Sequence, residues 1–333
     1  MKAMQLISPG PVEHSPLTLK ELARPTPGRG EVLLRVRACA VCHTDLHIAE
    51  GELPPKRIPV IPGHQIVGVV ESAGADSGNH LPGDRVGLPW LYSTDGSCEY
   101  CIGGQENLCS NARFTGYDVD GGFAEFVIAS DHFVYPIPKH FTDVDAAPLL
   151  CAGIVGYRAL RRSGIRPGER LGLFGFGASA HIVLQIARHR GCEVYVFSRG
   201  DHHRKLAEEL GATWTGSSDD VPPHLLHSAI SFAPSGELVP RALAVLRKGG
   251  TLALAGITMS PIPSLEYATL YHERTLCSVA NSTRQDAVDF LKVAAEIPVK
   301  TRVQAFPLSD ANRALQRLKT GSINGAAVLT MDH

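Results

Sequence analysis

Three side chains of the kinds that bind zinc stand far apart in this chain, at Cys42, His64 and Cys151. Three protein ligands that leave the fourth position to water or substrate form a catalytic zinc site, whereas a structural zinc is closed by four protein ligands. Separations as long as these are weakly diagnostic of a metal site. The spacing alone therefore leaves two interpretations open, a metal centre or unrelated polar positions.

The segment between the first two candidate ligands carries a hydroxyl, a carboxylate and an imidazole within four positions, at Thr44, Asp45 and His47. Such a cluster can orient a ligand and carry protons, because histidine titrates near neutral pH. The alternative is a polar loop whose side chains have ordinary partners, in which His47 is an exposed loop residue.

The length of 333 residues predicts two domains, because a single hydrophobic core stops growing below this size. Residues 1–151 are rich in glycine, proline and short alternating runs. They predict a mostly β domain with strands over 31–38, 66–71 and 122–129 and few helices before residue 140. We assign residues 285–333, a helix followed by a final helix and strand, to the same domain.

Residues 152–284 follow a different pattern, in which helical segments such as 152–162 and 181–189 alternate with short apolar strands. Alternation of this kind predicts a parallel sheet with helices on both faces. The fold class is therefore α/β, with this doubly wound unit inserted into the mostly β domain.

A glycine-rich turn lies where a dinucleotide-binding fingerprint requires it, after a predicted strand and at the start of a helix. Gly175 permits the tight turn, Gly177 lets the backbone approach a pyrophosphate, and Ala180 is an allowed variant at the third position. A glycine pair by itself is more often an ordinary turn. The βαβ pattern that follows it favours a nucleotide site.

The end of the next predicted strand distinguishes the two nicotinamide cofactors. An acidic residue there would accept hydrogen bonds from the adenosine ribose, but this chain has Ser198 and Arg199, and Arg204 adds positive charge. Arginine can bind a 2′-phosphate with two hydrogen bonds, which favours NADP(H) over NAD(H). The alternative is that these cations are solvated surface residues.

The bulk properties exclude several classes of protein. The formal net charge of -1 gives no indication of a nucleic-acid partner or an anionic membrane surface. No apolar run approaches the roughly 20 residues needed to span a bilayer, and the N-terminus has no signal-peptide core. We therefore expect a cytoplasmic protein, whose eight cysteines are thiols or metal ligands rather than disulfides.

Four motifs occur in the order seen in a known family, and the match covers essentially the whole chain. They are Cys42-His-Thr-Asp-Leu-His47, Gly63-His64 followed by Ile66-Val-Gly, Pro148-Leu-Leu-Cys151-Ala-Gly, and the glycine turn. In this combination the chain resembles the zinc-dependent medium-chain alcohol dehydrogenases, most closely the bacterial and yeast branch acting on primary alcohols. The resemblance implies a GroES-like catalytic domain, a Rossmann domain and a small-molecule alcohol or aldehyde substrate.

The resemblance also assigns roles to individual residues. It places Cys42, His64 and Cys151 on a catalytic zinc, which acts as a Lewis acid on the substrate oxygen while a hydride moves to or from the nicotinamide. It implies that Thr44 takes the substrate proton and that His47 lies at the outer end of that relay, reached through the cofactor ribose. Asp45 corresponds to the carboxylate that orients a ligating histidine.

A second, structural zinc site is expected from the resemblance, with one departure. The family uses four cysteines, whereas this chain has an aspartate at the first of the four positions, which are Asp95, Cys98, Cys101 and Cys109. A carboxylate can bind zinc at about the distance of an imidazole, so a site of one carboxylate and three thiolates is chemically feasible. The alternative is an empty lobe with three thiols.

Other departures concern the surroundings of the site. Gln65 replaces a glutamate common beside the ligand histidine, Val155 replaces a threonine near the nicotinamide, and Asn324-Gly325-Ala326 lacks an arginine that contacts the pyrophosphate in several relatives. Trp90 resembles an aromatic residue that lines the substrate pocket, which would favour small or flat substrates. The alternative for Trp90 is a simple buried position.

These observations predict a zinc-dependent, NADP-preferring alcohol dehydrogenase or aldehyde reductase, with a homodimer or homotetramer implied by the resemblance. One rival is the zinc-free branch of quinone and enoyl reductases. A second rival is a non-enzymatic protein that binds zinc and a nucleotide.

Overall fold

The computed structural model of the protein describes residues 1–297 and 299–331. It divides into two compact units. The first contains Met1–Cys151, Thr283–Ala295 and the chain from Thr301 onward, and the second contains Ala152–Ser282 and Glu296–Lys300. The short returning segment is tied to the second unit because the Lys300 amide donates to Gln185 Oε1 at 2.8 Å and Gln185 Nε2 donates to the Lys300 carbonyl at 2.9 Å.

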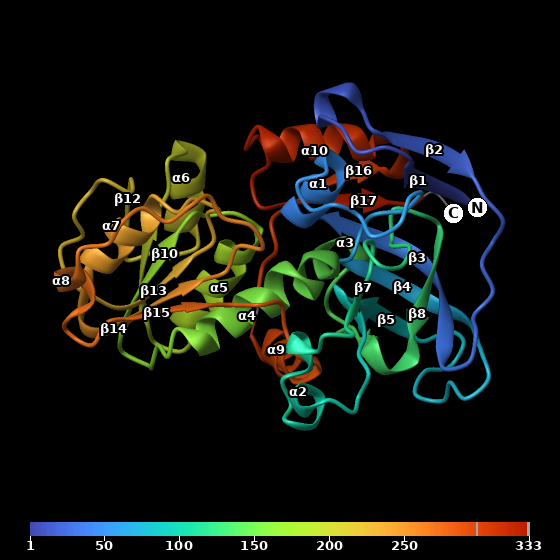
Figure 1. The fold of residues 1–333 in the computed structure, drawn as a ribbon, viewed down its shortest axis with the longest axis horizontal. Coiled ribbons are helices and arrows are strands. Elements are labelled where there is room, and N and C mark those ends of the chain that lie inside the picture. Colours follow the sequence, from blue (N-terminus) through green and yellow to red (C-terminus); the bar gives the residue numbers. More distant parts are fainter. Residues whose placement is uncertain (298, 332–333) are drawn as a thin grey trace. The chain divides into compact units, whose positions relative to one another are not determined.

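The first unit is built on a seven-stranded sheet in the order β16-β17-β3-β4-β5-β9, with β8 also paired to β3. All of these pairs are antiparallel except β16 with β17 (Figure 1). The remaining strands of this unit form two small antiparallel sheets, β1-β2 and β6-β7. The bounds are β1 (Lys2–Leu6), β2 (Leu17–Glu21), β3 (Glu31–Val41), β4 (Ile66–Ala73), β5 (Arg85–Leu88), β6 (Leu91–Ser93), β7 (Arg113–Phe114), β8 (Phe126–Ser130), β9 (Tyr135–Pro136), β16 (Val303–Pro307) and β17 (Ala326–Thr330).

The predicted strands at 31–38 and 66–71 are both present and extend further as β3 and β4. The strand predicted over 122–129 is wrong in its first half, because β8 begins only at Phe126. Before that point the backbone is used differently. The Gly122 amide donates to the Gly63 carbonyl and the Phe123 amide to the Pro62 carbonyl, both at 2.9 Å, which ties this segment to the loop that carries His64.

Besides the two helices predicted within residues 285–333, the first unit contains helical segments that were not predicted from the sequence. Its helical segments are α1 (His43–Glu50), α2 (Glu99–Ile102), α3 (Asp143–Ala146), α9 (Arg284–Glu296), α10 (Ala311–Lys319) and the single 3-10 turns η1 (Val12–His14), η2 (Glu106–Leu108), η3 (Asp131–Phe133), η4 (Ala147–Leu150) and η5 (Leu308–Asp310). The polar-loop alternative for the Thr44 segment is therefore wrong. Apolar residues at Leu46, Ile48 and Ala49 are buried, and their burial holds α1 against the core of this unit.

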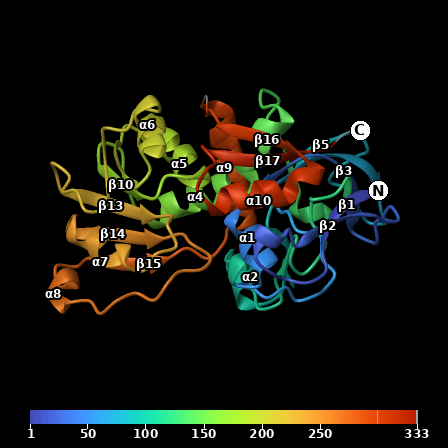
Figure 2. The ribbon, with the colours of Figure 1, turned by 90° about the horizontal axis from the view of Figure 1, so that it is seen from above.

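The second unit is a six-stranded parallel sheet in the order β12-β11-β10-β13-β14-β15. Counted along the chain this is the order 3-2-1-4-5-6 of a Rossmann fold, which confirms the predicted fold class. Four of these strands, β10, β13, β14 and β15, are labelled in Figure 2. The bounds are β10 (Arg170–Phe174), β11 (Glu193–Phe197), β12 (Trp214–Gly216), β13 (Leu226–Ser231), β14 (Leu246–Leu254) and β15 (Thr275–Ser278).

Helices of the second unit pack on its sheet and on each other. They are α4 (Ala152–Arg162), α5 (Ala178–His189), α6 (Asp201–Glu209), α7 (Leu238–Ala244) and α8 (Tyr267–Leu270). Val239 and Leu243 of α7 share a buried cluster with Phe174 and Phe197 of the sheet. Within residues 1–297 and 299–331, no helix combines the length and apolarity needed to cross a bilayer.

Candidate active site

The three candidate ligands of the first zinc site converge within the first unit. One ligand atom from each of Cys42, His64 and Cys151 lies within 4.8 Å of the other two. Cys42 directly precedes α1, His64 lies in the loop before β4, and Cys151 follows the 3-10 turn η4. Chain segments separated by 22 and by 87 residues thus bring two thiols and an imidazole to one place, which the sequence spacing could not establish.

Asp45 connects the segments that carry two of these ligands. Its Oδ2 accepts a hydrogen bond from the Cys42 amide at 2.8 Å, and its Oδ1 accepts from the Gly63 amide at 3.0 Å. The same Oδ1 lies 2.9 Å from His64 Nδ1. Asp45 and His64 are both completely buried. The carboxylate therefore fixes the His64 ring with Nε2 turned away from it, the arrangement that a metal-ligating histidine requires.

The electrostatics of this cluster favour a bound cation. Among the described residues, His64 Nε2 is a buried nitrogen with no hydrogen-bond partner. Burial opposes a charge on this ring, but the Asp45 carboxylate and contact with Cys42 outweigh it and raise the pKa of His64 to about 10. A hydrogen bond from Cys151 lowers the pKa of Cys42 well below its usual range. Two thiols and an imidazole nitrogen without a hydrogen-bond partner are ligands that zinc prefers. A bound zinc ion would take the place of the protons that these groups share.

Thr44 and His47 lie one turn apart on α1, so they share a face of the helix. Thr44 is buried, and its Oγ1 lies 3.8 Å from Cys42 Sγ, beside the ligand cluster. His47 is also buried, with 9% of its surface exposed, so it is not the exposed loop residue of the alternative interpretation. Its Nδ1 lies 2.5 Å from Glu52 Oε2.

Trp90 is buried and belongs to an aromatic cluster beside His64. Its ring meets the His64 ring edge-on with centroids 4.8 Å apart, and it stacks on Phe114 at 5.1 Å. Tyr117 lies 5.9 Å away on a tilted ring. Trp90 is therefore buried, as the alternative interpretation has it, and its ring also contacts a candidate metal ligand, while its place in a substrate pocket stays a prediction.

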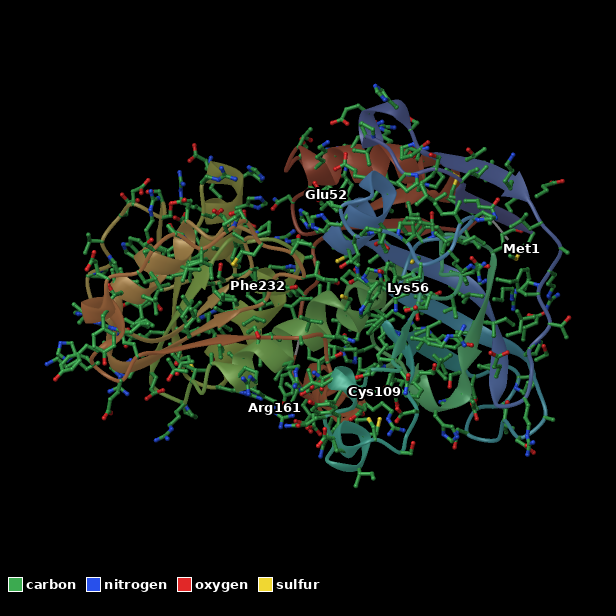
Figure 3. All side chains as sticks on the ribbon, in the orientation of Figure 1. Met1, Glu52, Lys56, Cys109, Arg161 and Phe232 are labelled. Atoms are coloured by element: carbon green, nitrogen blue, oxygen red, sulfur yellow. The ribbon has the colours of Figure 1, made fainter. Side chains whose placement is uncertain are left out.

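The second candidate metal site also assembles as expected. One ligand atom from each of Asp95, Cys98, Cys101 and Cys109 lies within 4.8 Å of the others. Sulfur atoms are visible beside the labelled Cys109 in Figure 3. Asp95 Oδ1 accepts from the Cys98 amide at 3.0 Å, and its Oδ2 lies 3.2 Å from Cys109 Sγ. Backbone hydrogen bonds, the one from Cys98 first, hold the pKa of Asp95 well below its usual range, so a carboxylate faces three thiols.

The glycine turn of the second unit has the expected geometry. Gly175 has a φ of +84°, and its amide donates to the Phe197 carbonyl at 2.8 Å. Gly177 is the N-cap of α5, and a Cβ placed there would meet no atom within 4 Å, which leaves open space at the helix N-terminus. Ala180 is completely buried in the first turn of α5. The helix begins at Ala178 rather than at the predicted His181.

The three residues predicted to bind the cofactor after β11 differ in exposure and in contacts. Ser198 is buried, while Arg199 is exposed. Arg204 instead folds back on this turn, where Nη1 donates to the Ser198 carbonyl at 2.6 Å and the guanidinium pairs with Asp201. Arg204 thus shapes the turn, and Arg199 presents the positive charge to solvent.

Sequence reasoning missed the glycines that support the His64 loop. A Cβ at Gly121 would lie 2.1 Å from the Gly63 carbonyl oxygen, so the two backbones approach as closely as only glycine allows. The Gly121 amide donates to the Ile61 carbonyl at 2.7 Å. The run Asp120-Gly121-Gly122 was the available signal.

Two of the departures from the family pattern can be placed in the structure. Gln65 is buried beside His64, and Gly325, with a φ of +93°, forms the turn into β17.

Comparison with known proteins gives consistent matches along the chain. The model of the alcohol dehydrogenase GroES-like domain matches residues 28–139, and that of the zinc-binding dehydrogenase family matches residues 180–296. A probable alcohol dehydrogenase AdhA from Mycobacterium tuberculosis is 48% identical, over 99% of this chain and 97% of the relative. An alcohol dehydrogenase from Geobacillus stearothermophilus is 39% identical, over 95% and 97% respectively.

The fold is also close to that of solved structures. A cinnamyl alcohol dehydrogenase from Sorghum bicolor superposes with a TM-score of 0.90 at 26% identity, covering 98% of this chain and 97% of that chain.

Proposed function

This chain belongs to the zinc-type medium-chain alcohol dehydrogenases, and from that premise we propose that it interconverts primary alcohols and aldehydes with NADP(H). The observation that carries the proposal is the convergence of Cys42, His64 and Cys151, with His64 Nε2 buried and without a partner among the described residues. When bound, zinc would supply a Lewis acid for the substrate oxygen and the nicotinamide would supply or accept the hydride.

The residues around the metal site have separate tasks in this proposal. Asp45 orients His64 through its hydrogen bond to Nδ1. It also holds the loop that carries His64 in place through its hydrogen bond with the Gly63 amide. The Thr44 hydroxyl holds the proton of the substrate hydroxyl in alcohol oxidation, and His47 passes it outward to solvent. Trp90 excludes water beside His64 and limits the width of substrates, which supports short primary alcohols or flat arylmethanols as the class.

The function is tested by a panel of alcohols and aldehydes assayed with both NADH and NADPH and both oxidised forms, after the metal content has been measured. We expect turnover of primary alcohols and their aldehydes only by the zinc-loaded protein. Turnover of quinones or enoyl compounds by a metal-free preparation would instead support the zinc-free branch of reductases. No turnover by a protein loaded with zinc and cofactor would support a non-enzymatic role.

The NADP(H) preference leads to a prediction at Arg199. Arg199→Asp places a negative charge where the 2′-phosphate would bind, so the ratio of kcat/KM with NADP⁺ to that with NAD⁺ is expected to fall. The expected fall is about 10- to 100-fold, because a hydrogen bond to a charged group contributes about 1.5–3 kcal/mol.

Arg247→Asp is a matched control for Arg199→Asp. Arg247 lies in β14 of the same unit and pairs with Glu169 at 3.7 Å, so the charge change is identical but lies elsewhere on the sheet. We expect this control to leave the cofactor ratio unchanged. An unchanged ratio in Arg199→Asp, or a higher kcat/KM with NAD⁺ in the unaltered protein, would contradict the assignment.

A second zinc in the lobe of Asp95, Cys98, Cys101 and Cys109 forms part of the proposal. The support is that one oxygen of a carboxylate and three sulfur atoms lie within 4.8 Å of one another, and that backbone amides hold Asp95 ionised. Asp95 contacts the Cys109 thiol and Asn111 Nδ2 through the same oxygen, which a metal would share. The lobe would then be a closed, structural site.

The compartment and assembly state remain parts of the proposal that rest on the family. All eight cysteines are free thiols in the structure, which supports a reducing compartment such as the cytoplasm. We propose a homodimer or homotetramer, the assembly that the family resemblance implies. Light scattering of the purified protein distinguishes the two assemblies.

A further inference from the structure

A carboxylate outside the family motif contacts the outer residue of the proposed proton relay. Glu52 Oε2 lies 2.5 Å from His47 Nδ1. The His47 side chain is 11% exposed, whereas that of Glu52 is 58% exposed, so the pair connects a buried imidazole with solvent. Glu52 is labelled in Figure 3.

The end of α1 places Glu52 against His47. The helix stops at Glu50, and Gly51 takes a left-handed conformation with a φ of +82°. The Leu53 amide then donates to the His47 carbonyl at 3.0 Å, so the chain folds back over the last turn of the helix. Glu52 lies between Gly51 and Leu53, and its side chain turns back to contact the His47 ring.

The other acidic residues of this helix have different partners. Asp45 accepts hydrogen bonds from the segments of Cys42 and His64. Glu50 binds Lys319 at 2.7 Å and accepts from the Val12 amide at 3.1 Å.

Other charged and titratable side chains also lie near α1. Lys319 of α10 pairs with Glu13 as well as with Glu50, and Glu13 and His14 lie on the 3-10 turn η1 that packs on α1. On α1 itself the ring of His43 lies 6.4 Å from that of His47. Glu52 is a carboxylate in direct contact with the His47 ring.

We propose that Glu52 is a positioning residue that holds His47 in the tautomer needed for proton transfer. A carboxylate that accepts the Nδ1 proton leaves Nε2 as the basic nitrogen. Nε2 then accepts the proton that leaves the substrate hydroxyl and releases it to water, while Nδ1 keeps its own proton in the hydrogen bond to Glu52. This inference rests on the proposed relay role of His47.

A double-mutant cycle on kcat for alcohol oxidation tests the inference. The variants are Glu52→Gln, His47→Gln and the double variant, each measured at saturating alcohol and NADP⁺ with zinc content determined. We expect Glu52→Gln to lower kcat by about 10-fold with little change in KM, and His47→Gln by about 10- to 100-fold. In the His47→Gln background the change at Glu52 is expected to have no further effect, within about twofold.

Glu50→Gln is the matched control, because it removes an equal charge from the same end of α1. It is expected to keep kcat within about twofold and to affect only stability, through the contacts to Lys319 and Val12. An additive loss in the double variant would overturn the inference, because Glu52 would then act independently of His47. A normal kcat in Glu52→Gln together with a low kcat in His47→Gln would also overturn the inference, but that outcome leaves the relay role of His47 intact. A normal kcat in His47→Gln would remove the relay role and the inference with it.

Discussion

Replacing Cys151 by serine is expected to remove one zinc ion per chain and to lower turnover of a primary alcohol by about 1000-fold or more. The loss follows from the Lewis-acid contribution of a catalytic zinc, several kcal/mol of barrier lowering, at about 1.36 kcal/mol for each factor of ten. Serine keeps the shape of the side chain but is a poor zinc ligand. The fold should survive, because Cys151 lies at a junction rather than inside a helix or strand.

Metal content and activity are measured on the same preparations. The unaltered protein is expected to contain two zinc ions per chain and Cys151→Ser one, and a single ion in the unaltered protein would contradict occupancy of the Asp95 lobe. Cys39→Ser is the matched control. Cys39 is fully buried only three residues before Cys42, and burial raises the pKa of its thiol well above the usual range, as expected of a core thiol that binds no metal. Full zinc and activity in Cys151→Ser would refute the proposed ligand set.

Thr44→Ala is expected to lower kcat by about 100- to 10,000-fold while leaving the zinc content unchanged. The estimate is the usual contribution of a positioned acid–base group, because alanine cannot take the substrate proton. Thr44 is 6% exposed and lies in the first turn of α1, where alanine is at least as good a helix former as threonine. A loss of activity therefore reports on the hydroxyl and not on the stability of the helix.

Thr44→Ser and Thr44→Val separate the hydroxyl from the methyl group. Serine restores the hydroxyl and is expected to retain most of kcat, whereas valine keeps the volume and is expected to behave like alanine. The measurement is kcat for alcohol oxidation with NADP⁺ and zinc by elemental analysis. Turnover at the unaltered rate in Thr44→Ala would take this residue out of the mechanism.

The Rossmann unit illustrates how local sequence can predict a fold. Short apolar strands at 170–174 and 193–197, each followed by a helix, are separated by turns whose residues have fixed backbone requirements. The parallel sheet and the tight turn at Gly175 are both observed. This unit is predictable because its hydrophobic periodicity and its glycine turn are properties of neighbouring residues.

Prediction from the sequence was less accurate where distant segments compete for the same backbone groups. Residues 122–125 alternate like a strand, yet the amides of Gly122 and Phe123 bind the loop around Pro62 and Gly63. Residues 43–50 look polar, yet they form α1, because burial of Leu46 and Ile48 outweighs a weak local preference. In both cases tertiary packing overrides the local pattern.

The sequence by itself determined the family resemblance, the α/β class and the identity of the candidate zinc ligands, because motif order and residue chemistry are written in the chain. Only the tertiary structure decided that Cys42, His64 and Cys151 meet, that Asp45 ties the ligand segments together, and that Glu52 reaches His47. The physical reason is that these contacts join segments across turns and loops. Their geometry depends on how the whole unit packs, and not on the spacing between residues.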